Sequence, residues 1–206
     1  MVNVCAFATS PRRHGNSETL LDWLLASMKD HPGVAVEKIA LDEITINPCR
    51  GCNACEKLGH CIQEDDLPWV LEKIIAADCI VLASPIFCMG LCAQAKALVD
   101  RTQVFRSRKY VLKIPVVPPE QKGKRLGVFL STAGQRWDIV FDGAIPSVKC
   151  FFHLSEVKDQ DIYYLLVDGV DEKGAIESHP TARSDAAALG AELVGRFSAM
   201  TGGGPA

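Results

Sequence analysis

The sequence contains no apolar run of the eighteen or so residues that a membrane-spanning helix requires. Its net charge of −3 comes from acidic and basic residues that are interspersed, and it has no basic stripe of the kind that binds nucleic acid. The first residues carry neither the charged segment nor the cleavage site of a secretory signal. We therefore expect a cytoplasmic protein that binds neither a membrane nor nucleic acid.

No internal repeat or linker divides the 206 residues. A chain of this length buries a large hydrophobic core without disulfides or metals, so we predict a single domain over 1–200 and a disordered tail at 201–206. The nine cysteines are expected to stay reduced in the cytoplasm. Their abundance favours metal binding or redox chemistry over a disulfide framework.

Short apolar runs typical of β-strands alternate with stretches of helical periodicity. The expected strands are 2–8, 34–40, 79–83, 126–130 and 163–167, and helices are expected at 17–28, at 67–77, at 138–150 and in the Ala-rich C-terminal segment. This alternation predicts an α/β fold in which a doubly wound, five-stranded parallel sheet has helices on both faces. Ligands bind such sheets at the carboxyl ends of the strands, so the loops that follow the strands are the candidate site.

The loop after the first strand reads TSPRRHGNS (9–17) and offers hydroxyls, two arginines and the N-terminus of the next helix. These groups suit a phosphate. The loop lacks the Gly-Lys-Ser/Thr ending of a Walker A motif and the G-x-G-x-x-G pattern of dinucleotide sites. The alternative is an ordinary strand-to-helix turn that Asn16 or Ser17 caps.

Two later loops strengthen the first interpretation. SPIFCMG (84–90) follows the third strand and leads into a helix with Lys96, Asp100 and Arg101, and STAGQRW (131–137) follows the fourth strand. Together, the three loops resemble those of the NADPH-dependent FMN reductase family, and the resemblance spans essentially the whole chain. It implies a flavodoxin-like fold with strand order 2-1-3-4-5, FMN as cofactor and NAD(P)H as electron donor. It also implies a homodimer or homotetramer in which a neighbouring subunit helps to close the flavin site.

The resemblance also implies which residues bind FMN. Its phosphate is assigned to Ser10, Arg12, Asn16 and Ser17. The isoalloxazine ring is assigned to Pro85, Ile86, Phe87, Met89 and Gly90, and its pyrimidine edge to Thr132, Ala133 and Gly134. The chain departs from the family at Cys88-Met89-Gly90, where an aromatic or glycine-rich pair is common. Cys88 and Cys92 are interpreted as buried packing residues or, alternatively, as soft contacts of the flavin.

Four cysteines follow the second strand with the spacing C-x2-C-x2-C-x5-C, at the same expected edge of the sheet as the FMN loops. Compact runs of thiolates hold iron–sulfur clusters, whereas zinc sites more often pair two separated knuckles. The run, with Gly51, Gly59 and the pair Asp65-Asp66, resembles that of iron–sulfur flavoproteins, which bind one [4Fe–4S] cluster beside FMN. The resemblance implies these cluster ligands: Cys49, Cys52, Cys55 and Cys61. A structured loop without a cluster is the alternative, and Cys5, Cys79 and Cys150 are expected in the core.

The resulting hypothesis is an FMN-dependent oxidoreductase of the iron–sulfur flavoprotein type. It would transfer electrons between FMN, a [4Fe–4S] cluster and a redox partner such as a ferredoxin or a small acceptor. No side chain is expected to act as nucleophile or general base, because the cofactors carry the chemistry. The first alternative is a cluster-free NAD(P)H-dependent FMN or quinone reductase. The second is a flavodoxin-like electron carrier or regulatory module that turns nothing over.

Overall fold

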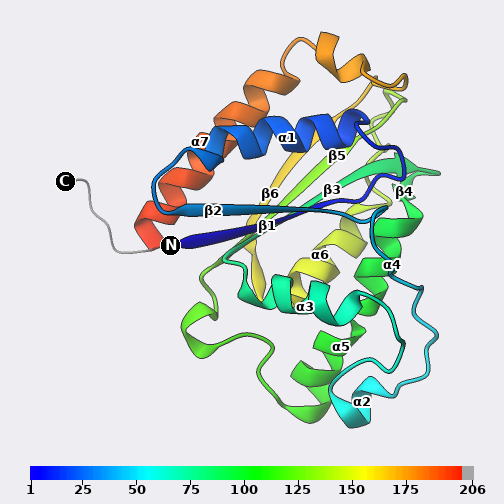
Figure 1. Cartoon of the computed structure of the whole chain (residues 1–206). Coiled ribbons are helices and arrows are strands. Elements are labelled where there is room, and N and C mark those ends of the chain that lie inside the picture. Colours follow the sequence, from blue (N-terminus) through cyan, green and yellow to red (C-terminus); the bar gives the residue numbers. More distant parts are fainter. Residues whose placement is uncertain (201–206) are drawn as a thin grey trace.

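The structure of the protein, a computed structural model, describes residues 1–200, and the tail predicted to be disordered, 201–206, lies outside them (Figure 1). The strands are β1 (Val2–Ala8), β2 (Val34–Ala40), β3 (Cys79–Phe87), β4 (Gly90–Leu91), β5 (Arg125–Thr132) and β6 (Val157–Val167). The α-helices are α1 (Asn16–Lys29), α2 (Cys55–Leu58), α3 (Leu67–Ala76), α4 (Ala93–Arg101), α5 (Gln103–Arg106), α6 (Ile145–Leu154) and α7 (Ala182–Met200). Shorter turns of helix are η1 (Ser107–Leu112), η2 (Pro119–Gln121) and η3 (Ala175–Ser178).

Five long strands form the parallel sheet in the order β2-β1-β3-β5-β6, which is the predicted order of five strands. The additional strand β4 was not predicted; it pairs antiparallel with the end of β3 and shifts the numbering. Cys88 and Met89 form the turn between these strands with φ values of 47° and 64°. Such left-handed turns are usually signalled by Asn-Gly, so this sequence gave no sign of a hairpin.

Each face of the sheet packs against its own helices, because side chains alternate along the strands. From β1, Phe7 points into a core formed with α3, α4 and α6, and Ala6 points into a core formed with α1 and α7. Figure 1 shows these two helical layers on opposite sides of the sheet. The loops at the carboxyl ends of the strands are left free to form sites.

Two predicted elements have different bounds in the structure. The helix expected at 138–150 is α6, which begins at Ile145 and ends at Leu154, after turns over 138–144. Pro146 lies in its first turn, where the missing N–H of proline costs no hydrogen bond. The last strand begins at Val157, six residues before the predicted start, and a register shift interrupts its pairing between Arg125 and Gly127.

Candidate functional site

The loops after β1 and β5 and the last residues of β3 meet in one pocket at the carboxyl ends of these strands, and the loop after β6 completes it. The lining includes most of the residues that the family resemblance assigns to FMN: Ser10, Arg12, Asn16, Ser17, Pro85, Ile86, Phe87, Thr132 and Gly134. The resemblance does not assign Gly15, Val170 or Asp171, which also line the pocket. The pocket therefore joins four segments that lie far apart in the sequence.

The first loop folds around its own backbone. The Ser10 hydroxyl accepts a hydrogen bond from the Arg12 N–H at 3.0 Å, and Gly15 is the N-cap of α1. A Cβ at Gly15 would lie 3.0 Å from the Arg12 carbonyl, so a side chain fits poorly there. The helix N-terminus and its positive dipole end consequently open into the pocket, an arrangement that binds anions.

The two arginines of this loop have different surroundings. Arg13 forms ion pairs with Glu18, Asp42 and Glu43. Over the described residues 1–200, Arg12 has no carboxylate partner, and it lines the pocket. Arg12 is therefore the cation that remains available to an anionic ligand.

Glu18, in the first turn of α1, contacts the loop after β1 through a side chain that is only 2% exposed. Its carboxylate accepts a hydrogen bond from the backbone N–H of His14 and pairs with Lys38 at 3.0 Å. Burial alone would raise the pKa of Glu18, but these contacts and Arg13 lower it below its ordinary value. Glu18 thus stays charged and fixes the loop, including His14 in its left-handed conformation (φ 53°).

Asn16 has a role that the sequence did not indicate. Its side-chain amide donates to the carbonyls of Val170 and Glu172 at 2.9 and 2.8 Å, and its side-chain oxygen accepts from the N–H groups of Gly174 and Ile176. All four hydrogen-bonding positions of the side chain are used, which leaves none for a phosphate. The side chain of Asn16 instead fixes the loop after β6, which carries Asp171 into the pocket.

Three residues assigned to FMN from the sequence do not line the pocket. Met89 and Gly90 belong to the β3–β4 hairpin, and the Met89 carbonyl lies against Gly143, where a Cβ would be only 2.1 Å away. Ala133 is buried, and its backbone bonds to Val167 and Val170. Ala133 therefore joins the loops after β5 and β6.

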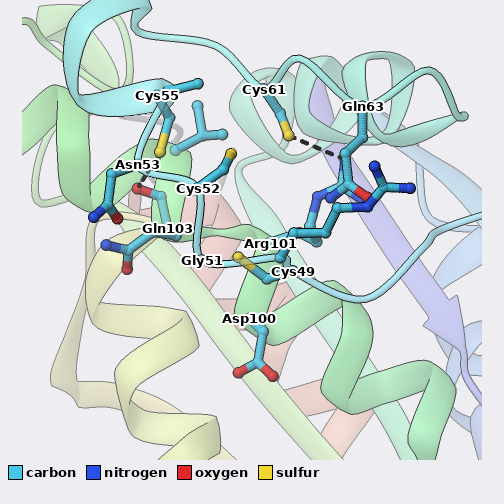
Figure 2. Close-up of a pocket in the computed structure, with 13 residues that line it drawn as sticks. Cys49, Gly51, Cys52, Asn53, Cys55, Cys61, Gln63, Asp100, Arg101 and Gln103 are labelled. Carbon is cyan, nitrogen blue, oxygen red and sulfur yellow. Dashed lines mark hydrogen bonds between the residues drawn. The ribbon is translucent and has the colours of Figure 1, made fainter.

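The four cysteines of the compact run line a second cavity, of about 310 Å³, which Gln63 and the residues around the junction of α4 and α5 complete. Figure 2 shows the four sulfur atoms around one region of this cavity. Cys49 and Cys52 are exposed, whereas Cys55 and Cys61 are partly buried. Within residues 1–200, no three histidine, cysteine or carboxylate side chains come together as a site for a metal ion.

The inner wall of this cysteine cavity contains a buried ion pair. Arg101 is 1% exposed and pairs with Asp65, whose side chain is fully buried, at 2.6 Å. Burial opposes charge on Asp65, but the hydrogen bonds from Arg101 and from two backbone N–H groups lower the pKa of its carboxyl. The pair therefore remains charged, and its guanidinium contacts the cysteine loop at Cys61.

The other cysteines have different environments. Cys5 and Cys79 are buried in the sheet, as predicted, and burial raises the pKa of each thiol to about 12. Cys150 is exposed, so its prediction as a core residue was wrong: it lies on the outer side of α6. Cys92 is buried, whereas Cys88 is exposed at the tip of the hairpin. High thiol pKa values make Cys5 and Cys79 poor metal ligands.

Helix α4 connects the two sites. Its N-cap, Cys92, contacts Thr9 in the loop after β1 and Ser84 near the end of β3. Its last residue, Arg101, lies in the cysteine cavity. The helix has nine residues and rises about 14 Å. One site is the pocket at the strand ends, and the other is the cysteine cavity. The two are separated by about the length of α4.

The model of the NADPH-dependent FMN reductase family matches residues 2–138, which include the three loop motifs 9–17, 84–90 and 131–137 and the whole cysteine run. The chain belongs to this family. An iron-sulfur flavoprotein of Archaeoglobus fulgidus is 31% identical over 136 residues, 64% of this chain and 61% of the relative. An iron-sulfur flavoprotein of Methanocaldococcus jannaschii is 37% identical over 105 residues, 51% of this chain and 54% of the relative.

The fold of this FMN reductase family member also occurs in solved structures. An FMN-dependent NADH-azoreductase of Bacillus anthracis, in complex with FMN, superposes with a TM-score of 0.68 over 94% of this chain and 100% of that one. The sequence identity is 15%, so the likeness concerns the fold. The match spans only 61% and 54% of the length of these two iron-sulfur flavoproteins. None of its described helices is both long and apolar enough to span a bilayer.

Proposed function

We propose that the chain is an FMN-dependent oxidoreductase of the iron–sulfur flavoprotein type. One observation carries this proposal: the pocket at the strand ends and a cavity that four cysteines line adjoin opposite ends of the same helix, α4. Family membership supports the flavin, and the printed names of the relatives support the cluster. NAD(P)H is proposed as the electron donor, and a ferredoxin or a small molecule as the acceptor.

On the flavin side, each group of residues has a distinct task. The N-terminus of α1, with Ser10, Ser17 and Arg12, would bind the terminal phosphate of FMN. Pro85, Ile86 and Phe87 would contact the ring, and Phe87 is 49% exposed, so one side of the pocket stays open to a reactant.

Two features of the cysteine cavity fit an iron–sulfur cluster. It supplies four thiols, and two buried polar atoms in its lining have no hydrogen-bond partner in the described structure. Cys49, Cys52, Cys55 and Cys61 supply the four thiolates that such a cluster takes. Two further residues of the lining, Gln63 and Arg101, have buried side-chain atoms without a hydrogen-bond partner in the described structure, Oε1 and Nε respectively. Buried unsatisfied groups are rare and often mark the place of an ion or water. The Arg101 N–H is a donor of the kind that cluster sulfur accepts.

When bound, FMN exchanges electrons in pairs or singly and a [4Fe–4S] cluster exchanges them singly, so together they couple two-electron donors to one-electron acceptors. The chain holds the two sites at opposite ends of α4 and leaves Cys49 and Cys52 at the surface. This exposed edge is the side that we propose for a protein partner.

We further propose that the protein is cytoplasmic and acts as a homodimer or homotetramer whose partner subunit closes the flavin pocket. The loop after β5, which supplies Gly134, also carries two exposed apolar side chains, Trp137 at 56% and Ile139 at 60%. Phe87 is a third exposed apolar side chain, and exposed apolar groups of this kind suit burial against a second copy.

FMN is expected to bind at least about 100-fold more tightly than riboflavin, because the phosphate gains several charge-assisted hydrogen bonds of about 1.5–3 kcal/mol each. Arg12→Ala should weaken FMN binding about tenfold or more and leave riboflavin binding nearly unchanged. Fluorescence titration of the apoprotein with each flavin measures both effects.

The matched control is the neighbouring arginine. Arg13 is occupied by three carboxylates, so Arg13→Ala should reduce the preference for FMN less than Arg12→Ala. Equal affinity for FMN and riboflavin in the wild type would show that this loop does not bind a phosphate.

A further inference from the structure

The buried guanidinium of Arg101 connects both ends of the cysteine loop. Its Nη1 donates to the Asn47 carbonyl at 2.6 Å, just before the first cysteine. Its Nη2 donates to the Sγ of Cys61, the last cysteine, at 3.3 Å. Figure 2 shows this bond from Arg101 to the sulfur. One side chain on α4 therefore ties together the two points between which the other three cysteines lie.

Asp65 fixes the guanidinium in this position. Its carboxylate accepts from Nη1 at 2.6 Å and from Nη2 at 3.1 Å, and it also accepts from the backbone N–H groups of Asn47 and Leu67. The bidentate pair sets the orientation of the guanidinium plane. Arg101 thus reaches Cys61 from a position that these contacts with Asp65 determine.

A second donor supports another inner sulfur. The hydroxyl of Ser107, at the start of η1, is buried and donates to the Sγ of Cys55 at 3.2 Å. The two partly buried thiols of the cavity therefore each have a hydrogen-bond donor from the protein. Cys49 and Cys52 are exposed, so water can donate hydrogen bonds to their sulfur atoms.

We propose that Arg101 is a positioning residue that preforms the cysteine loop and, together with Ser107, raises the reduction potential of the cluster bound there. The inference rests on the proposed cluster for its second half only. Hydrogen bonds to the sulfurs and the net charge nearby are two of the factors that set cluster potentials. Reduction adds negative charge to the cluster, so a donor or a cation at a ligand sulfur stabilises the reduced form more than the oxidised form.

The sign of the effect follows from the order of the charges. The Arg101 guanidinium lies between the Asp65 carboxylate and the sulfur of Cys61, so the positive end of the ion pair faces the ligand. The negative charge of Asp65 opposes this field. It cancels only part of it, because the carboxylate is farther from the sulfur than the guanidinium is. Removing Arg101 together with the charge of Asp65 should therefore lower the potential, and removing the charge of Asp65 alone should raise it.

The test uses full-length protein, reconstituted anaerobically with iron and sulfide, and measures the cluster potential by dye-coupled titration. R101M/D65N removes the donor without leaving an uncompensated buried carboxylate, which would strongly destabilise the fold. D65N leaves the guanidinium uncompensated, and S107A removes the smaller donor and should fold without difficulty. Arg106 is the matched control, because it pairs with Glu56 near the same loop and is 42% exposed.

R101M/D65N is expected to lower the potential by at least 59 mV, a tenfold smaller equilibrium constant for one-electron reduction. S107A should lower it by less, D65N should raise it, and R106M should leave it unchanged. A merely structural role for Arg101 does not produce shifts of opposite sign. Potentials in R101M/D65N and S107A equal to that of R106M would overturn the second half of the proposal.

Hydrogen exchange of the iron-free protein tests the first half by itself. Amides over residues 48–60 should exchange at least tenfold faster in R101M/D65N than in wild type or R106M, whereas the sheet should be unaffected. Equal exchange would overturn the preformed loop. Wild-type protein that takes up no iron would reject the cluster, and with it the effect on potential, but the exchange result would still decide whether Arg101 preforms the loop.

Discussion

Cys49→Ala is expected to abolish iron binding and leave FMN bound. Cys49 is exposed, and no hydrogen bond of its side chain is found in the described structure, so the substitution removes a ligand without disturbing the fold. The loop after β1, which is proposed to bind the FMN phosphate, is a separate element at the other end of α4. The iron content of anaerobically reconstituted protein should therefore fall from about four per chain to near zero, while the flavin content stays the same.

Cys150→Ala is the matched control, because Cys150 is also exposed but lies on α6, outside the cysteine cavity. It should keep the full iron content. Iron retained by Cys49→Ala at the wild-type level would remove Cys49 from the ligand set and contradict the role of the compact run.

Arg125→Met is expected to destabilise the protein by about 3–5 kcal/mol, a large part of the stability of an ordinary domain. Arg125 is 1% exposed and donates to the carbonyls of Ile74, Ala77 and Ser155. These carbonyls lie at the C-terminal ends of α3 and α6, which carry partial negative charge. Burial lowers the pKa of Arg125 to about 10, so it remains charged at neutral pH and binds two helix ends at once.

The measurement is urea unfolding at saturating FMN, so that ligand binding contributes equally to both proteins. Arg196→Met serves as the comparison: Arg196 is 51% exposed, and its ion pair with Asp161 should contribute less than about 1 kcal/mol. A loss in Arg125→Met no larger than that in Arg196→Met would show that the three carbonyls do not depend on the guanidinium.

The sheet and both helical layers could be predicted from the sequence because their signals are local. Apolar runs such as 79–83 read as buried strands, and the spacing of leucines over 17–28 reads as a helix. The hairpin at β4 could not be predicted, since Cys88 and Met89 adopt left-handed conformations without the residues that usually favour them. Its turn is determined by contacts such as that of the Met89 carbonyl with Gly143.

In the candidate sites, too, local sequence motifs indicated some residues and gave no sign of others. Loop motifs indicated Ser10, Arg12 and the four cysteines, because each motif is contiguous in the sequence. The roles of Asn16 and Asp171 depend on hydrogen bonds between residues more than 150 positions apart, which no local pattern reveals. The contacts of Arg101 with Asp65 and Cys61 also join separate segments. Long-range polar contacts therefore account for most of what the sequence did not show.

One chain is proposed to carry both FMN and a [4Fe–4S] cluster, at opposite ends of α4. Iron, acid-labile sulfide and flavin should be determined together in wild-type protein that is expressed, purified and reconstituted without oxygen. We expect about four irons and about four sulfides per chain, the content of one cluster, together with bound FMN. Protein that binds FMN but stays free of iron after reconstitution would contradict this proposal and favour a cluster-free NAD(P)H-dependent flavin or quinone reductase.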